Sequence, residues 1–314
     1  MNSIKSVEIW WDGLLVGRLA LTREGLCAFE YSAEQLASGV SISPFELPLR
    51  SGVFVAKPRP FDGGFGVFDD CLPDGWGLLV LDRYLQKKGV NPRSLTLLDR
   101  LSLVGSPGGA RPKIFTRYDG REWLVKFQAK GDPKNIGATE YRYSQLAKEC
   151  GMEMPETRLF EDKYFGVERF DRTPNGKLHV VSMAGLLCAD YRIPSLDYSH
   201  IFKVCAALTH SVGEMWKIYR LMCFNYLIGN KDDHAKNFDF IYRDGEWRFA
   251  PAFDLLPGDG MNGYHTTSIN DSIEPTQADL IAVAANAGLD KDEAETVFEK
   301  IEQTIKSNKV SWMR

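Results

Sequence analysis

The sequence contains few cysteines for its length, and no two of them have the spacing of a metal-binding or redox pair. Six cysteines are spread over 314 residues without a C-x-x-C motif. Small secreted domains that depend on disulfides are short and rich in cysteine, so we expect reduced thiols in a cytoplasmic protein. The first ten residues, MNSIKSVEIW, lack the apolar stretch of a signal peptide, which favours the same location.

Long hydrophobic runs and an excess of positive charge are also missing. The most apolar run, LMCFNYLIG at 221–229, is far shorter than the roughly 20 residues that span a bilayer. Lys and Arg number 38 against 42 Asp and Glu, a net charge of -4, whereas proteins dedicated to nucleic-acid binding usually carry a basic surface. With 44% hydrophobic residues, the composition predicts about two globular domains. The short apolar runs argue against membrane insertion, and the net charge argues against a dedicated nucleic-acid binder, although a local basic patch stays open.

Several catalytic signatures are absent as well. The sequence has no G-x-S-x-G motif and no Walker A motif, which argues against a hydrolase triad and a P-loop. Only five histidines occur, and none has the spacing of a zinc ligand with another. A transition-metal site formed by Asp232, Asp233 and His234 is therefore a less favoured alternative.

Strand-like and helix-like patterns divide the chain into a β-rich first half and a mainly helical second half. Asp-Gly pairs lie between β-rich runs and predict hairpins at 12–13, 119–120 and 244–245. A further β segment is expected over 101–127, after a small α+β domain that ends near residue 97. Helical spacing is found from Trp76 to 85 and over 139–150, 198–209, 213–227 and 277–307. The fold class we expect is α+β.

Two features of the β-rich half suit a nucleotide. Gly105, Gly108 and Gly109 belong to a Gly-rich turn, GSPGGARPK, where backbone N–H groups could approach a phosphate closely. An ordinary β-turn is an equally good interpretation of the turn taken alone. Lys126 lies between apolar residues of a strand, and its ammonium could hold the phosphates of a nucleotide. A lysine at a sheet edge, with its ammonium in solvent, is the simpler interpretation of this residue taken alone.

The helix expected over 139–150 carries an acid on its apolar face. Glu140 shares a stripe with Tyr143, Ala147 and Cys150. Burial of a lone carboxylate is costly, so Glu140 needs a partner, and Lys126 is a suitable one. A first-turn glutamate that interacts with the helix dipole is the alternative.

The most specific pattern lies in GNKDDHAKN at 229–237, followed by PAFDL at 251–255. Asp232 and Asn237 have the D-x-x-x-x-N spacing of a kinase catalytic loop, in which the Asp positions the attacking hydroxyl and the Asn binds metal. Asp254 follows one hairpin later, where a second Mg²⁺ ligand is needed. A polar loop that caps a helix is the structural alternative.

In this order, the motifs closely resemble the HipA family of bacterial serine/threonine kinases, the toxin halves of toxin–antitoxin modules. The resemblance covers nearly the whole chain. The segments that carry it are SPGGARPK at 106–113, WLVKF at 123–127, GVERFDR at 166–172, GNKDDHAKN at 229–237, PAFD at 251–254 and, near the N-terminus, VEIWWDGLLVG at 7–17 and LPDG at 72–75. The resemblance implies a kinase-like bilobal fold with an N-terminal domain at 1–97, an N-lobe at 98–172 and a helical C-lobe at 173–314.

The resemblance also implies a role for each site residue. Asp232 would be the catalytic base, and Asn237 and Asp254 would hold Mg²⁺. Ser106 falls where the family carries an autophosphorylated serine. The residues that would contact ATP are Lys126, Glu168, Phe170, His234, Gly105, Gly108 and Gly109, with Glu140 in a supporting role.

Finally, the resemblance implies partners. A helix-turn-helix antitoxin of the HipB type would bind the chain and would carry its link to DNA, and the substrate would be a translation component such as an aminoacyl-tRNA synthetase. Two alternatives stay open: a small-molecule phosphotransferase on a kinase-like fold, and a catalytically inactive binding module. The segment that leads into the Gly-rich turn is shorter than the family pattern.

Overall fold

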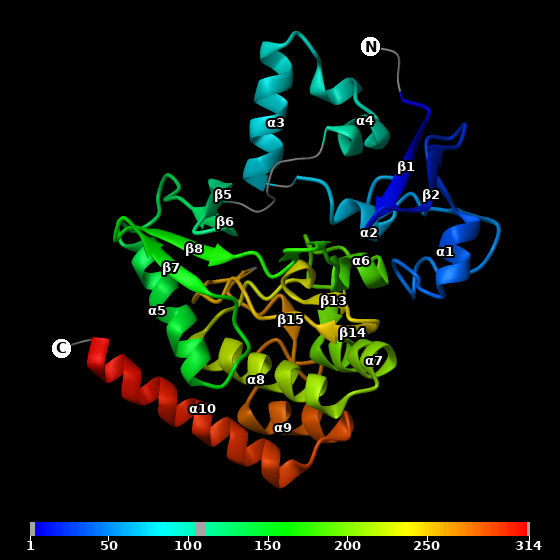
Figure 1. Ribbon diagram of the computed structural model, residues 1–314. Helices are drawn as coiled ribbons and strands as arrows, with labels where there is room; N and C mark the ends of the chain where they lie inside the picture. The colour runs from blue at the N-terminus through cyan, green and yellow to red at the C-terminus, as the bar shows by residue number, and fades with distance from the viewer. Residues whose placement is uncertain (1–3, 74, 104–110, 261, 313–314) are drawn as a thin grey trace.

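The computed structural model describes residues 4–73, 75–103, 111–260 and 262–312. The N-terminal unit, residues 4–73 and 75–103, contains an antiparallel sheet of order β1-β2-β3-β4 and several helices (Figure 1, blue to cyan). The elements are β1 (Ser6–Trp11), β2 (Leu14–Leu21), β3 (Cys27–Tyr31), α1 (Ala33–Ser38), β4 (Val53–Val55), α2 (Gly66–Asp69), α3 (Gly75–Lys87), the short 3-10 helix η1 (Pro92–Ser94) and α4 (Leu97–Ser102).

Helix α4 corrects one expectation, because Leu101 lies in this helix and not in a β segment. Thr96 and Asp99 form a capping box: the Thr96 hydroxyl accepts a hydrogen bond from the Asp99 N–H, and the Asp99 carboxylate accepts one from the Thr96 N–H. The helix then packs against β1 and β2. The capping box and this packing favour the helix over the expected strand at Leu101.

After the N-terminal unit, the chain forms a second antiparallel sheet of order β5-β6-β8-β7, and helix α5 packs on its strands β7 and β8 (Figure 1). Its elements are β5 (Lys113–Tyr118), β6 (Arg121–Lys126), α5 (Ile136–Glu149), β7 (Thr157–Phe160) and β8 (Tyr164–Glu168). Gly137 lets α5 begin close to the turn before β8, since a Cβ there would lie 2.1 Å from the carbonyl oxygen of Lys163. The helix therefore begins three residues before the expected start at 139.

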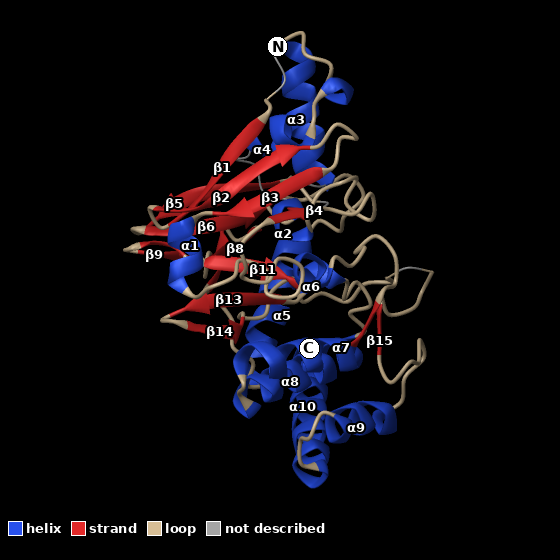
Figure 2. Cartoon of the chain, turned by 90° about the vertical axis from the view of Figure 1, so that its right-hand side faces the viewer, coloured by secondary structure: helices blue, strands red, loops and turns tan. Residues whose placement is uncertain are grey.

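The rest of the chain combines a small sheet, of order β11-β13-β14, with a set of helices (Figure 2). The expected helix over 277–307 is two helices, separated at Gly288, whose φ of +85° favours glycine. The elements are β9 (Arg172–Thr173), β10 (Gly176–Lys177), β11 (His179–Ser182), α6 (Met183–Leu187), β12 (Leu196–Asp197), α7 (Tyr198–Thr209), α8 (Val212–Ile228), η2 (Ala235–Asn237), β13 (Asp239–Arg243), β14 (Glu246–Phe249), β15 (Thr267–Ser268), α9 (Gln277–Asn286) and α10 (Lys291–Trp312).

The three Asp-Gly hairpins are confirmed. Each pair connects two antiparallel strands, and both of its residues have positive φ. Positive φ at both central residues is the signature of the tight turn that matches the twist of a hairpin. The helices at 198–209 and 212–228 agree with the expected ranges to within one residue.

His179 lies where the N-terminal unit contacts the β11-β13-β14 sheet. A ring nitrogen is 2.7 Å from the carbonyl oxygen of Ile42, and the ring packs between Trp11 and Trp247. Burial lowers the pKa of His179 from 6.5 to about 4. The folded protein therefore holds this imidazole neutral at pH values where the unfolded chain protonates it.

The sign of the resulting pH dependence follows. Because the pKa is lower in the folded state, stability should fall as the pH drops through the window between 6.5 and about 4. Between pH 7 and pH 5, the free energy of unfolding of the wild type should fall by about 2 kcal/mol more than that of His179→Gln. Denaturant titrations at both pH values measure it. Glu46 and Asp70, whose raised pKa values act in the opposite direction, are present in both proteins and cancel. An equal pH dependence in the two proteins would contradict this account.

Candidate active site

Lys126 joins the two lobes at the centre of the candidate site. It ends β6, and its Nζ lies 2.5 Å from Oε1 of Glu140 on α5 and 2.6 Å from Oδ1 of Asp254. Lys126 and Glu140 are buried, whereas the Asp254 side chain is 39% exposed. The expected pairing of Lys126 with Glu140 is confirmed, and Tyr143, on the same stripe of α5, is buried as expected.

Mutual attraction keeps Lys126 and Asp254 charged. Burial opposes the Lys126 ammonium, but the carboxylates of Asp254 and Glu140 outweigh it and raise the pKa of Lys126. The same ammonium holds the pKa of Asp254 well below its usual range. Burial raises the pKa of Glu140, although Lys126 opposes this effect. Lys126 is thus a fixed cation at neutral pH, and Asp254 is a fixed anion.

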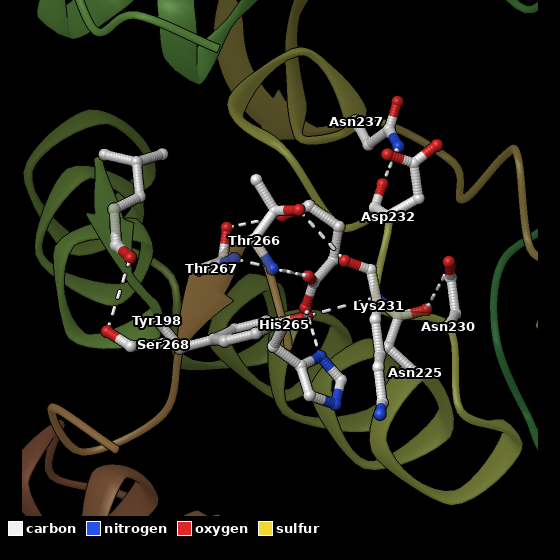
Figure 3. Close-up of polar contacts among 12 residues, drawn as sticks. Tyr198, Asn225, Asn230, Lys231, Asp232, Asn237, His265, Thr266, Thr267 and Ser268 are labelled. Atoms are coloured by element: carbon white, nitrogen blue, oxygen red, sulfur yellow. Dashed lines mark hydrogen bonds and ion pairs between the residues drawn. The ribbon is translucent and has the colours of Figure 1, made fainter. Parts of the chain in front are cut away.

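The loop after α8 presents Asp232 and Asn237 on one side, as Figure 3 shows. Nδ2 of Asn237 donates a hydrogen bond of 2.7 Å to the carbonyl oxygen of Asp232, which fixes the amide group and leaves its oxygen available. Desolvation is the main cause of a raised pKa at Asp232; His234 opposes it, and the nearby Asp254 and Asp233 add to it. A carboxylate with a raised pKa is a better proton acceptor.

Asp233 has the opposite role from its neighbour, since it is completely buried. Its Oδ1 accepts hydrogen bonds from the N–H groups of Thr266 and Thr267, and its Oδ2 lies 3.0 Å from Nδ1 of His265 and 3.3 Å from the Tyr198 hydroxyl. In Figure 3 these partners gather on the side of the loop away from Asp232. Asp233 is therefore an anchor for the loop, and Asp232 is the accessible carboxylate of the pair.

A chain of buried polar groups connects this anchor to Asp254. The Tyr198 hydroxyl accepts a hydrogen bond of 3.1 Å from Asn225, whose Oδ1 accepts one of 3.0 Å from Asn230 (Figure 3). Nδ2 of Asn230 also lies 3.4 Å from the carbonyl oxygen of Asp254. Buried polar networks with satisfied partners hold a site in one geometry. The sequence motif alone gives no signal for Asn225 or Tyr198, which lie on the helices before it.

Three further expected site residues, Glu168, Phe170 and His234, lie in the described part of the chain. Glu168 ends β8 and forms an ion pair of 2.9 Å with Arg121. The ring of Phe170 stacks on Phe253, next to Asp254, with centroids 6.1 Å apart. His234 caps the N-terminus of η2, and its Nδ1 accepts a hydrogen bond of 3.3 Å from the Lys236 N–H. The other four expected residues, Gly105, Ser106, Gly108 and Gly109, lie outside the described part of the chain.

Asn237 and Asp254 together offer an amide oxygen and a carboxylate, the hard oxygen donors that Mg²⁺ prefers. Mg²⁺ at a nucleotide site takes one or two carboxylates and completes its shell with phosphate oxygens and water. Among the described residues, no three His, Cys, Asp or Glu side chains converge as a metal site. By donor type alone, Asn237 and Asp254 fit Mg²⁺ that is shared with a nucleotide.

Family models match nearly the whole chain. The model of the HipA N-terminal domain matches residues 7–108, and the model of the HipA-like C-terminal domain matches residues 105–309. The chain belongs to the HipA family. Both halves of the family pattern are present in one polypeptide, so the resemblance stated from the motifs is confirmed.

Individual relatives agree with this assignment. The proteins Y4dM and Y4mE of Sinorhizobium fredii, both described as candidate kinases, are 28% and 26% identical and cover 62% and 81% of this chain. The serine/threonine-protein kinase toxin HipA of Shewanella oneidensis is 23% identical over 57% of the chain. The chain spans 52% of Y4dM, 77% of Y4mE and 50% of the Shewanella protein.

A solved structure shows the same fold. The complex of HipA, HipB and operator DNA from Shewanella oneidensis MR-1 contains a chain that matches with a TM-score of 0.69 and 19% identity. The match covers 94% of this chain and 87% of that one. The expected α+β, kinase-like fold with a preceding N-terminal domain is therefore confirmed. Within the described ranges, no helix is both long and apolar enough to cross a membrane.

Proposed function

We propose that the chain is an ATP- and Mg²⁺-dependent protein serine/threonine kinase that acts as a toxin of the HipA type. The observation that carries the proposal is the contact of Lys126 with both Glu140 and Asp254, together with the loop that presents Asp232 and Asn237. Phosphoryl transfer requires little covalent chemistry from a protein, and catalysis rests on positioned charges and a base for the attacking hydroxyl. The family and the fold support the same activity.

Each group would have a distinct task in this reaction. Lys126 would hold the nucleotide phosphates, and Glu140 would keep the ammonium in place. Asp232 would orient the acceptor hydroxyl and take its proton, a task that suits its raised pKa. Mg²⁺, when bound by Asn237 and Asp254, would neutralise charge on the β- and γ-phosphates.

Further nucleotide contacts follow from the family pattern. Backbone groups at Glu168 and Phe170 would meet the adenine, and His234 would lie beside the phosphates. The glycines at 105, 108 and 109 would cover the phosphates with backbone N–H groups. The stacking of Phe170 on Phe253 supports this placement, because it brings the end of the N-lobe sheet next to Asp254.

The proposed biological role involves two partners. One is a helix-turn-helix antitoxin of the HipB type, which would provide the contact with DNA; the fold match to a HipA chain solved with HipB and operator DNA supports it. The other is the substrate, a translation component such as an aminoacyl-tRNA synthetase. A cytoplasmic location is part of this proposal.

A growth experiment tests the role, and a transfer assay tests the activity. Expression of the wild-type chain alone should arrest a bacterial host, whereas Asp232→Asn should be harmless at the same protein level. Purified wild-type protein should move label from γ-labelled ATP to host proteins only with Mg²⁺. Normal growth combined with label in small molecules would contradict the toxin assignment and favour a small-molecule phosphotransferase.

Self-inactivation at Ser106 is a further expected outcome. A phosphate on the Gly-rich turn would add a charge of about -1.5 to -2 that repels the phosphates of ATP. Mass spectrometry of the expressed wild-type protein should find phosphate on Ser106, and the Asp232→Asn protein should lack it. The phosphorylated form should bind Mg·ATP at least about 10-fold more weakly than the unmodified form, as titration calorimetry measures. Equal affinity of the two forms would refute the switch.

A further inference from the structure

The N-terminal unit contacts the candidate catalytic loop through an ion pair that the motifs do not reveal. Asp69, the last residue of α2, places Oδ2 3.0 Å from Nζ of Lys236, the residue before Asn237. Both side chains are largely buried, at 20% and 13% exposure. The Lys236 ammonium also lies 4.2 Å above the ring of Tyr191. A buried ion pair with a stacked ring fixes the direction of the Lys236 side chain.

Charge supports the persistence of this contact. Burial opposes the Lys236 ammonium, but Asp69 and Asp70 outweigh it and raise the pKa of Lys236. Lys236 therefore remains charged at neutral pH. Removal of one partner would leave the other charge in a partly dehydrated place, which is unfavourable.

Asp70, the neighbour of Asp69, makes a second contact that supports the other end of η2, the short turn that contains Lys236 and Asn237. Asp70 accepts hydrogen bonds of 2.8 Å from both the N–H and the hydroxyl of Ser182, the residue that caps α6. The first residue of α6, Met183, donates a hydrogen bond of 2.8 Å to the carbonyl oxygen of Phe238. The short turn that carries Asn237 is thus fixed on both sides, at Lys236 directly and at Phe238 through α6.

The packing between these elements leaves little freedom for movement. Figures 1 and 2 both show α2 beside α6, and a Cβ on Gly66 would come within 2.9 Å of the Ala184 carbonyl oxygen. On the facing side, a Cβ on Gly185 would lie 2.2 Å from Oδ2 of Asp70. The two backbones approach each other closely, so a displacement of α2 would be transmitted to α6.

We propose that Asp69 is a positioning residue for phosphoryl transfer, and that the N-terminal unit thereby forms part of the support of the catalytic loop. The proposal rests on the function proposed above, because it assigns the loop with Asp232 and Asn237 to that reaction. Asp69 does not touch the reacting groups. It acts through Lys236, whose neighbour Asn237 holds the Asp232 carbonyl. Catalytic rates are sensitive to displacements of about 1 Å in such a loop.

The test measures turnover of γ-labelled ATP by the full chain, counted as label in protein plus label released to water. Asp69→Asn and Lys236→Gln should each lower kcat about 10-fold and leave the KM for ATP within about twofold of the wild type. The double variant should be no slower than Lys236→Gln alone, because that change already removes the contact with Asp69. Asp82→Asn is the matched control: it breaks the Asp82–Arg100 ion pair inside the N-terminal unit and should leave kcat unchanged.

The outcomes separate this inference from the proposed function. Turnover that depends on Asp232 but is the same in Asp69→Asn and wild type would overturn the inference and leave the kinase assignment intact. Rate losses that multiply in the double variant would overturn it as well, since they would show independent effects. A wild-type protein that is folded, as shown by a cooperative thermal transition, and that still lacks Mg²⁺-dependent turnover would refute the function itself. A lowered kcat with an unchanged melting temperature in Asp69→Asn supports positioning over a purely structural role.

Discussion

Replacement of Asp232 by Asn should lower phosphoryl transfer by about 10³-fold while Mg·ATP still binds. The Asn side chain keeps the shape of Asp232 but cannot take the proton of the attacking hydroxyl. The substitution keeps the backbone carbonyl of residue 232, which accepts the hydrogen bond from Asn237, and it leaves the contact of Lys126 with Asp254 intact, so the proposed nucleotide and metal ligands should stay in place. Transfer is measured with γ-labelled ATP, and affinity is measured by titration calorimetry.

Asp233→Asn is the matched control, because it makes the same chemical change at the adjacent position. Asp233 is buried and its carboxylate has four polar partners, so an amide in its place leaves some of them unsatisfied. This variant should lose about 1–3 kcal/mol of unfolding free energy. Asp232→Asn should lose little stability. Full transfer activity in Asp232→Asn would contradict the assignment of the base.

Lys126→Met should be the most damaging change for stability and activity together. It removes a buried cation and leaves Glu140, with a side chain only 4% exposed, without its counter-charge. Such a loss typically costs about 3–5 kcal/mol of unfolding free energy. Phosphoryl transfer should fall by at least about 10²-fold, because the charge that would hold the phosphates is gone. Denaturant unfolding and the ATP transfer assay measure the two effects.

The stability loss in Lys126→Met should depend on pH. Burial already raises the pKa of Glu140, and removal of Lys126 raises it further. A raised folded pKa means that stability is present at low pH and is lost as the pH rises through that value. The variant should therefore recover stability on acidification from pH 8 to 5. The double variant Lys126→Met with Glu140→Gln should be less pH-dependent than the single variant; an equal dependence would contradict this electrostatic account.

Sequence reasoning predicted the local elements and one long-range contact. The Asp-Gly turns require positive φ, which few other pairs adopt easily, so the hairpins could be placed to the residue. Glu140 could be paired with Lys126 because an acid on an apolar helix stripe must be neutralised once the helix is buried. The contact of Lys126 with Asp254, 128 residues apart, follows from the fold and has no local signal.

The spacing to Asn237 assigned the base to Asp232, but the burial of Asp233 as an anchor for the candidate loop could not be predicted from the sequence. Asp232 and Asp233 are adjacent and chemically identical, and only the packing of residues 265–267 against the loop decides which carboxylate is buried. The same limit applies to Asp69, because α2 lies far from Lys236 in the sequence. Helix α4 was not predicted, because it has only six residues and the expected β segment was begun at Leu101, inside it.

The most direct test of the account is a single transfer measurement on the full chain. Wild-type protein, γ-labelled ATP and a host protein extract are incubated with Mg²⁺ or with EDTA, and the labelled amino acids are identified after hydrolysis of the protein. The account predicts phosphoserine or phosphothreonine with Mg²⁺, none with EDTA and none with Asp232→Asn of equal melting temperature. Equal labelling by wild type and Asp232→Asn, or no labelling by folded wild-type protein, would contradict it.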